Sequence, residues 1–534
     1  MEPVIHKKYG WLIAVAVATP GLYICLAVHY PISSSLVDPR ASWASLVTPN
    51  GLNLTLHLAV YLGLTLLYLA AMHLLTPAAA NRGAPPRYQI ALILTVWLAC
   101  SGVLMFVAPA GESHDIFDYL FRGRMMTEYQ ANPLAEVPES FGLSIPYVRY
   151  LAWRKNVDTY GPIWEASSAG VASIVRQVSS WIGWWDESYP VCPKSPESCR
   201  LLVVYIAGYR MLAIILAGLS GWIIASMVRR NQPSLAPLAL AVWLLNPMTL
   251  VATALGGHND AVMLVLILSS CWLLQRQHPY LAMLALILAA HVKLTALIWL
   301  PACALWILWR WGWGRALKVG LASAVSGLVL SWLLYAPFGG WQSLPRMLQE
   351  RSQYLANSLW RIVRYLLINQ WDWPVESAHR LTVELPTWLF AAGALLISLW
   401  IFNLRPKRWR GTPIPLEKGD QMLWRALVAI SMLYLVIGSF WFQTWYVLWV
   451  IAPAALLPGS WFTRSIIPWL VFGALSANLA MDFLSATLLK TAPPIFGYIL
   501  VVVIIWSPAV IAMGFQFLPG YRRLINPRLS RARD

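Results

Sequence analysis

The chain has 534 residues, of which 59% are hydrophobic and only 11% are charged. A soluble domain of average composition carries about 25% charged residues, so the soluble globular, disordered and secreted classes are excluded. The net charge of +17 would suggest nucleic acid in a soluble protein, but here the charges lie between long apolar runs. Six cysteines are too few for a disulfide scaffold. The composition indicates a polytopic membrane protein with no nucleic-acid partner.

Several apolar runs are long enough to cross a bilayer core of about 30 Å, which needs about 20 mostly apolar residues. Two further regions, 280–309 and 445–458, are less regular, and the first holds His291 and Lys293 near its middle. The clear spans are 11–30, 53–75, 89–109, 201–228, 236–256, 260–275, 316–336, 385–403, 422–440, 463–485 and 495–517.

The distribution of charge decides how 280–309 folds. If it is a hairpin of two short helices with His291 and Lys293 at its tip, the chain has 14 spans and both termini lie on one side. The segments on that side then hold 22 Lys and Arg and 4 acids, whereas the remainder holds 17 and 18. Because short cytoplasmic loops are rich in Lys and Arg, we predict this hairpin, with both termini cytoplasmic.

Two long segments, 110–200 and 337–384, then lie on the extracytoplasmic side. The first holds 11 of the 22 acidic residues of the chain. This concentration favours a catalytic loop at 110–200, and the alternative is a loop that is polar only because it faces water. We expect residues 1–534 to form a single integral-membrane domain.

The first outer loop opens with an amphipathic pattern. Asp115, Asp118, Tyr119 and Arg122 fall at i, i+3, i+4 and i+7, which is one face of a helix, and apolar residues cover the other. The pattern predicts an interfacial helix that lies along the membrane surface and presents a carboxylate above the bilayer. The alternative is an interfacial helix with ordinary solvated acids.

The two aspartates of this helix have different surroundings. Asp115 begins the helix, so the positive end of the helix dipole favours its ionised form. Asp118 lies one turn from Arg122, which suits it to orient a hydroxyl group of a substrate or to pair with that arginine. Both aspartates are therefore candidates for a general base, and Asp115 is the one that begins the helix.

A second polar cluster, Gly256-Gly257-His258-Asn259-Asp260, stands at the outer junction of two predicted spans. Ionisable residues at this depth are functional candidates. The alternative reading is an N-terminal cap for the span that begins at Asp260, since Asn and Asp are good caps.

Lys293, at the predicted hairpin tip, is a cation in apolar sequence and needs an anion or access to water. Its partner is either a lipid phosphate or a structural salt bridge to Asp260. Arg210, inside the fourth span, is a second buried cation that serves the same anion or pairs with an acid.

The segment from Trp441 to Trp449 is rich in aromatic residues at an outer boundary. Aromatic belts are ordinary at membrane interfaces, and stacking on sugars is the functional alternative. The sequence shows no metal-ligand cluster and no nucleotide-binding motif.

These pieces, in this order, resemble the GT-C superfamily of glycosyltransferases, and within it the polyprenyl-phosphomannose-dependent α-1,6-mannosyltransferases of actinobacterial envelopes. The likeness covers most of 110–300 and the region 440–455. The matching stretches are Asp115-x-x-x-Tyr119-x-x-x-Gly123, Asn132-Pro133, Tyr160-Gly161-Pro162, Tyr209-Arg210, Asn246-Pro247, Gly257-His258-Asn259-Asp260-Ala261, Val292-Lys293 and Trp445-Tyr446-x-x-Trp449.

The resemblance implies an all-α GT-C fold and an inverting transfer of mannose from a polyprenyl-phosphate donor to a glycan or glycolipid acceptor. It places the active site at the extracytoplasmic face of a bacterial plasma membrane and implies no cofactor. It also implies Asp115 as the catalytic base, although Asp118 stands where many relatives carry a non-acidic residue. The candidate substrate-binding residues are Asp118, Tyr119, Arg122, Tyr160, His258, Asn259, Asp260, Trp445 and Tyr446, and the candidate donor-phosphate residues are Lys293, Arg210, His258 and His291.

The chemistry fits these residues independently of the family. A phosphate leaving group departs as a stable anion, so transfer needs one base and stabilising cations but no general acid. Glycoside hydrolysis would need two flanking carboxylates, whereas Lys293 and Arg210 favour phosphate. Arabinofuranosyl or glucosyl transfer stays open, and a lipid-linked sugar flippase or transporter is the alternative of another class.

Four of the six cysteines lie in predicted spans and are expected to be small core residues. Cys192 and Cys199 lie in the first outer loop, where an oxidising exterior would permit them to form a disulfide.

The predicted topology has a direct test. A Lys155→Cys variant, made with Cys192 and Cys199 replaced by serine, should react with a membrane-impermeant thiol reagent in intact cells, because the 110–200 loop is expected outside. The same background without the new cysteine is the control. Labelling that appears only after lysis would reverse the orientation.

Overall fold

The computed structural model describes residues 2–32, 51–77, 86–108, 113–142, 145, 147–185, 200–403 and 416–515. Within these ranges the protein is helical and has no β-strand. Nine of the described helices are long and apolar enough to cross a membrane, or ten if a bent pair counts as one span. The predicted all-α class is confirmed, while the 14 spans and the single domain stay predictions. Cys192 and Cys199 lie outside the described residues.

Helices occupy all the segments that the hydropathy pattern marks as spans. Their bounds are α1 (Glu2–His29), α3 (Gly51–Leu75), α4 (Pro86–Leu104), α7 (Arg200–Asn231), α8 (Ala236–Leu244), α9 (Pro247–Leu250), α10 (Asp260–Gln275), α11 (Pro279–Ala290), α12 (Leu300–Tyr335), α15 (Val375–Phe402), α16 (Leu416–Leu433), α17 (Leu448–Ala455), α18 (Ile467–Ala486) and α19 (Pro494–Phe515). The helices outside these spans are α5 (Asp115–Thr127), α6 (Pro162–Trp181), α13 (Ser343–Ser352) and α14 (Leu359–Asn369).

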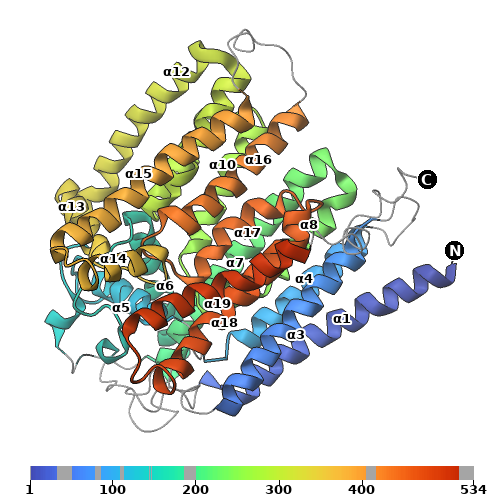
Figure 1. Ribbon diagram of the computed structural model, residues 1–534, viewed down its shortest axis with the longest axis horizontal. Coiled ribbons are helices and arrows are strands. Elements are labelled where there is room, and N and C mark those ends of the chain that lie inside the picture. The colour runs from blue at the N-terminus through green and yellow to red at the C-terminus, as the bar shows by residue number, and fades with distance from the viewer. Residues whose placement is uncertain are drawn as a thin grey trace.

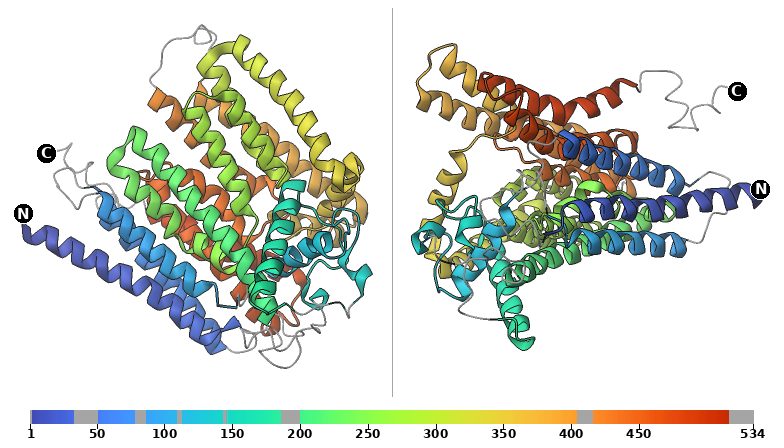
Figure 2. Two further views of the ribbon diagram at one scale, coloured as in Figure 1. Left: turned by 180° about the vertical axis from the view of Figure 1, so that it is seen from behind. Right: turned by 90° about the horizontal axis from the view of Figure 1, so that it is seen from below.

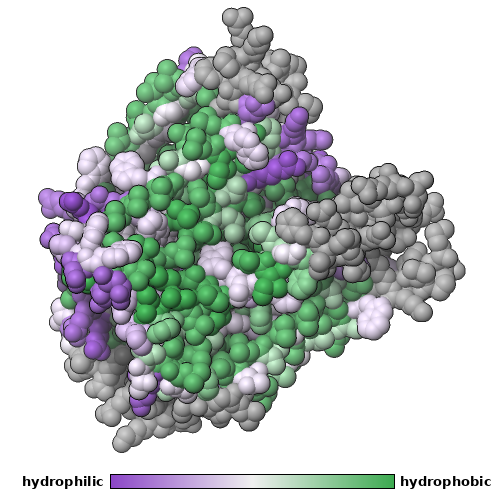
Figure 3. Space-filling view, viewed as in Figure 1, coloured by the Kyte–Doolittle hydropathy of each residue, from purple (hydrophilic) through white to green (hydrophobic). Residues whose placement is uncertain are grey.

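The long helices form one bundle, with α1, α3 and α4 along one edge and α12 and α15 along the other (Figure 1). Helices α5, α6, α13 and α14 gather at one end of the bundle, away from the end where α1 begins and α19 ends (Figures 1 and 2). We call this the site end. Apolar side chains cover the middle of the visible face and hydrophilic ones gather at the site end (Figure 3), as expected for a bundle whose middle lies in lipid.

The predicted hairpin at 280–309 is confirmed. Helix α11 ends at Ala290, the chain turns, and a short 3₁₀ helix, Leu294–Trp299, leads into α12, which packs back along α11. Gly312 then breaks α12 with φ 75° and ψ 176°, a backbone conformation that favours glycine. Lys293 therefore lies at the tip of the hairpin, at the site end.

The polar cluster that ends at Asp260 is placed by a bend in the preceding span. The Asn246 side chain accepts a hydrogen bond from the N–H of Met248 at 2.9 Å, and Pro247 starts the next helix. The two parts of the span meet at 52°. Gly257, with φ 61°, then makes the turn into α10. The bend and the turn bring the first residue of α10 to the site end.

Candidate functional site

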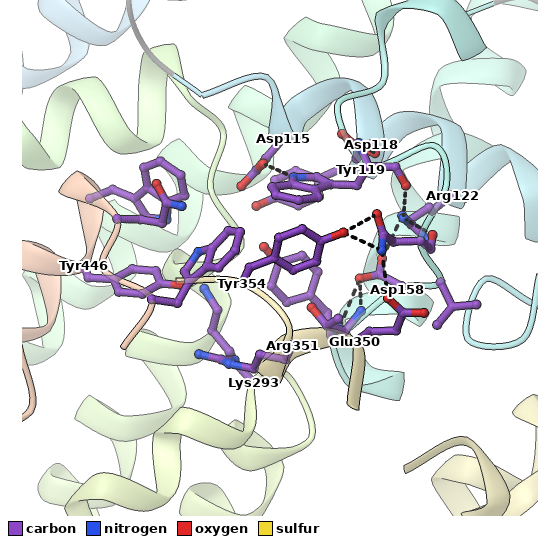
Figure 4. Close-up of a pocket in the computed structure, with 18 residues that line it drawn as sticks. Asp115, Asp118, Tyr119, Arg122, Asp158, Lys293, Glu350, Arg351, Tyr354 and Tyr446 are labelled. Carbon is purple, nitrogen blue, oxygen red and sulfur yellow. Dashed lines mark hydrogen bonds and ion pairs between the residues drawn. The ribbon is translucent and has the colours of Figure 1, made fainter. Parts of the chain in front are cut away.

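A cavity opens at the site end between α5, the loop 151–160, α13 and the segment 441–446 (Figure 4). It holds about 720 Å³ of empty space, part of which is open to solvent. The residues that line it are Asp115, Asp118, Tyr119, Arg122, Trp153, Asn156, Val157, Asp158, Thr159, Tyr160, Lys293, Glu350, Arg351, Tyr354, Trp441, Gln443, Trp445 and Tyr446. Many of the residues singled out from the sequence thus meet in one place.

Helix α5 begins at Asp115, as predicted, but its acids do not face open water. All its residues from Asp115 to Met125 are buried, because α6 and α7 pack on it and its apolar side chains join the core. Its polar face borders the cavity instead. The amphipathic pattern identified the two faces correctly. The predicted position along the membrane surface is wrong, because the apolar face packs into the protein core, and so is the alternative of solvated acids.

Asp115 is held at the start of α5 by hydrogen bonds. The Trp153 indole N–H donates to Oδ1 at 3.2 Å, and the backbone N–H of Asp115 donates to the Ser113 hydroxyl at 3.0 Å. Burial raises the pKa of this carboxyl, while hydrogen bonds from Trp153 and Ser113 and the charge of Lys293 act in the opposite direction. Burial, rather than the helix dipole, is therefore the largest influence, and it opposes the predicted ionised state.

Asp118 is engaged by the backbone of the following loop. Its two carboxylate oxygens accept the N–H groups of Ala152 and Trp153, both at 3.2 Å. Burial raises its pKa to about 8, although Arg122 lowers it. Arg122 forms its own ion pair with Asp158, with Nε 3.3 Å from Oδ2. These contacts replace the predicted pairing of Asp118 with Arg122, because the loop that carries Asp158 supplies partners to both.

Lys293 forms a buried ion pair with Asp260. Its Nζ lies 3.0 and 3.1 Å from the two carboxylate oxygens, and the exposed fraction of either side chain is at most 1%. The Trp449 indole N–H donates to Asp260 Oδ1 at 2.6 Å. The rings of Tyr160, Tyr446 and Trp449 surround the ammonium at 5.2, 4.9 and 5.6 Å. The salt-bridge alternative for Lys293 is confirmed, and the lysine also borders the cavity.

The predicted Tyr-Gly-Pro stretch, 160–162, docks on the hairpin tip. The N–H of Gly161 donates to the carbonyl of Val292 at 2.9 Å. A Cβ atom on Gly161 would collide with the carbonyl of His291, so only glycine fits this junction. This close approach of the two backbones holds the Tyr160 ring beside the Lys293 ammonium.

The two remaining polar residues of the cluster before α10, His258 and Asn259, do not line the cavity. His258 stacks on the Trp445 ring with 4.0 Å between centroids, and both side chains are buried. The Asn259 side chain accepts a hydrogen bond from Lys293 at 3.5 Å. Asn259 makes no side-chain cap of the helix that begins at Asp260, so the capping alternative is wrong.

Three residues predicted to hold the donor phosphate, His258, Arg210 and His291, do not line the cavity. An Nη1 N–H of Arg210 donates to the carbonyl of Met105, near the end of α4, at 2.6 Å. The ring of His291 lies 2.8 Å from the hydroxyl of Ser331 on α12. The cations that line the cavity are Arg122, Lys293 and Arg351.

The sequence analysis missed the contribution of the second outer segment. Glu350 and Arg351, near the end of α13, and Tyr354, just after it, line the cavity. A parallel backbone bridge between Ala356 and Trp441 holds this segment in place. In the sequence these residues belong to a polar run at the end of an amphipathic helix, a pattern that does not by itself indicate a functional site.

Two of the cations that line the cavity lie apart from two of its acids. Lys293 and Arg351 lie on one side, across from Asp115 and Asp118 (Figure 4). This arrangement accommodates a ligand with a negative group beside the cations and a hydroxyl group beside the acids. No cluster of metal-ligating side chains occurs among the described residues.

Comparisons with known proteins show which family the chain resembles. A family model described as Alpha-(1->6)-mannopyranosyltransferase, N-terminal domain, matches residues 10–310, and one described as Glycosyltransferase family 87 matches residues 199–439. A probable alpha-(1->6)-mannopyranosyltransferase of Mycolicibacterium smegmatis is 23% identical over 428 residues, which are 71% of this chain. Alpha-(1->6)-mannopyranosyltransferase A of Corynebacterium glutamicum is 25% identical over 366 residues, which are 62% of this chain. The match spans 66% of the length of each relative.

The helical bundle and these matches define the class of the protein as a multi-pass membrane protein with the GT-C fold, similar to known glycosyltransferases. More specifically, the chain belongs to the alpha-(1->6)-mannopyranosyltransferase family, whose model covers more than half of it. The family expected from the sequence motifs is therefore confirmed.

The close junction at Gly161 yields a prediction. Gly161→Ala should lower the free energy of unfolding by about 1–3 kcal/mol, because the added methyl group overpacks the contact with the hairpin tip. Gly170→Ala, on the same helix with open space around it, is the matched control and should stabilise by about 0.5–1 kcal/mol. Thermal unfolding in detergent measures both, and equal stabilities for the two variants would contradict the proposed junction.

Proposed function

We propose that the protein transfers mannose from a polyprenyl-phosphate donor to a hydroxyl group of a glycan or glycolipid acceptor, on the extracytoplasmic side of a bacterial plasma membrane. The observation that carries this proposal is the cavity in which Asp115 stands across from Lys293 and Arg351. The names of the two relatives support the sugar and the α-(1→6) linkage. The excess of Lys and Arg on the predicted cytoplasmic side supports the orientation.

Lys293 and Arg351 suit the phosphate group of the donor. Phosphate leaves as a stable anion, so its departure needs no general acid, and nearby cations stabilise the charge that develops on it. Asp260 and the surrounding rings hold the Lys293 ammonium in place before the donor arrives. Arg351 comes from a separate segment and adds a guanidinium group. A guanidinium can donate two parallel hydrogen bonds to two oxygens of one phosphate.

Asp115 is the proposed base that removes the proton from the acceptor hydroxyl. Both oxygens of Asp118 are engaged by backbone N–H groups, and its raised pKa keeps it largely protonated at neutral pH. Asp115 borders the same cavity and is oriented by the Trp153 indole. A single displacement, with the hydroxyl attacking as the phosphate leaves, inverts the anomeric centre.

The direct test is transfer by the purified protein. Incubation with synthetic polyprenyl-phosphate mannose and short mannosides should yield elongated mannosides. Asp115→Asn should lower kcat by about 10²–10⁴-fold, as expected for loss of a general base. Asp118→Asn should retain measurable activity, because in this assignment Asp118 holds the loop at Ala152 and Trp153 and takes no proton from the acceptor.

Donor binding is the control for both variants, since each should still bind the donor lipid. If the two phenotypes are reversed, Asp118 is the base and the enzyme class stands. If neither substitution slows transfer, the first outer loop does not carry the base.

The pH dependence tests the same assignment. A base acts in its ionised form, so kcat/KM should rise with pH through the pKa of Asp115, which burial places above the ordinary value of 3.8. The hydrogen bond from Trp153 lowers this pKa. Trp153→Phe should therefore move the acid limb of the profile to higher pH, and a shift to lower pH would contradict the role of Asp115.

The buried ion pair makes a further prediction about the phosphate. Lys293→Met alone should destabilise the protein by about 3–5 kcal/mol, because it leaves the Asp260 carboxylate buried without its partner. Combining it with Asp260→Asn removes both charges and should restore most of that stability. Donor affinity, measured by equilibrium binding, should stay low in both variants. A stable double variant with wild-type donor affinity would reduce Lys293 to a structural residue.

A further inference from the structure

Three aromatic rings meet at the cavity, and each comes from a different segment of the chain. Trp153 belongs to the first outer loop, Tyr354 to the segment after α13, and Trp441 to the segment before α17. Their ring centroids lie 5.2 to 5.4 Å apart, with tilted or edge-to-face geometry. All three side chains are only partly buried and all line the cavity. We call these three residues the aromatic triad.

Backbone hydrogen bonds join two of the segments that carry the triad. The backbone N–H of Ala356 donates to the carbonyl of Phe440 at 3.2 Å, and the N–H of Phe442 donates back to Ala356 at 2.9 Å. These two bonds join the segments that carry Tyr354 and Trp441. The backbone therefore holds these two segments side by side, and the rings pack on one another across the junction.

Polar groups beside the triad are linked to it. The Asn156 amide N–H groups donate to the Tyr354 hydroxyl at 3.0 Å and to the Glu350 carboxylate at 2.8 Å. The Trp153 indole donates to Asp115, the proposed base. A ligand that lies on the triad therefore has an amide and carboxylates within reach of its hydroxyl groups, and one of those carboxylates is the base.

The charge around the triad selects against anions. Asp115 and Glu350 line the cavity and accept hydrogen bonds from the uncharged side chains of Trp153 and Asn156. The nearby cation Arg122 is already committed, since it pairs with Asp158 and also donates to the carbonyls of Trp153 and Asn156 at 3.3 and 3.0 Å. A negatively charged group beside the triad would face these two carboxylates, whereas an uncharged polyhydroxyl compound can donate hydrogen bonds to them.

We propose that the aromatic triad is the acceptor subsite and that it takes an uncharged pyranoside whose C–H face stacks on Tyr354 and Trp441. This inference rests on the proposed function and assigns its second substrate. Because Trp153 contacts both the other rings and Asp115, a sugar on the triad presents a hydroxyl group beside the base. The phosphate of the donor binds at the opposite, cationic side.

The first test separates the two substrates kinetically. Tyr354→Leu should raise the KM for a short synthetic mannoside by about tenfold, the size expected for loss of one aromatic contact, and should change the KM for polyprenyl-phosphate mannose much less. Tyr354→Phe keeps the ring and should stay within about threefold of the wild-type acceptor KM. Trp441→Leu is an independent variant of the same subsite. Trp371→Leu, which removes an exposed aromatic residue outside the cavity, is the matched control.

The second test uses charge. An uncharged methyl mannoside should compete with the acceptor at least about tenfold better than the corresponding uronate, and Glu350→Gln should narrow that ratio because one carboxylate is gone. Equal competition by the two analogues would overturn the proposal.

The outcomes distinguish the subsite from the overall reaction. A wild-type protein that transfers mannose, together with folded Tyr354→Leu and Trp441→Leu variants of unchanged acceptor KM, would reject the subsite and leave the function standing. A folded wild-type protein that transfers mannose to none of the mannosides would reject the proposed function and the subsite with it. Thermal unfolding in detergent verifies that each variant is folded.

Discussion

The ion pair between Lys293 and Asp260 is the interaction on which the cavity depends. Removing two charges from water is costly, and the cost is offset only by close geometry and further hydrogen bonds. Here both carboxylate oxygens contact the ammonium, and the Trp449 indole donates to one of them. Since Lys293 lies at the hairpin tip, Asp260 at the start of α10 and Trp449 in α17, the pair and the indole together hold three parts of the bundle to one another. The stretch 160–162 then packs on the same tip and brings the first outer loop with it.

The Tyr209-Arg210 motif connects helix α7 of the bundle to the helices of the first outer loop. The Tyr209 hydroxyl donates to the carbonyl of Ser168 on α6 at 2.9 Å and lies 3.2 Å from the carbonyl of Tyr119 on α5. Arg210 donates to the carbonyl of Met105, beyond the end of α4. Neighbouring residues on α7 thus fasten α4, α5 and α6. Arg210 lies outside the lining of the cavity, so this contact gives it a positioning role, and its part in binding the phosphate stays a prediction.

Features that depend on local composition could be predicted from the sequence. Hydropathy located the helices of the bundle, the charge asymmetry identified the hairpin, and the motifs brought Asp115, Lys293 and Tyr446 into one proposed site. Features that depend on contacts between distant segments could not be predicted. Asn156 and Glu350 are 194 residues apart, and nothing near either of them in the sequence indicates that they meet. Arg351 could not be predicted either, because only tertiary packing brings it to the cavity from the segment 337–384.

The position of Trp449 in the chain has a consequence for synthesis in the membrane. Trp449 follows Asp260 by 189 residues, so at about 5–20 residues per second the ribosome needs about ten seconds or more to reach it. Lys293 follows Asp260 by only 33 residues and lies in the adjoining hairpin. The two opposite charges can therefore neutralise each other as soon as α10, α11 and the start of α12 have left the translocon. An early neutral pair lets this hairpin stay in lipid while the ribosome completes the helices that later enclose it.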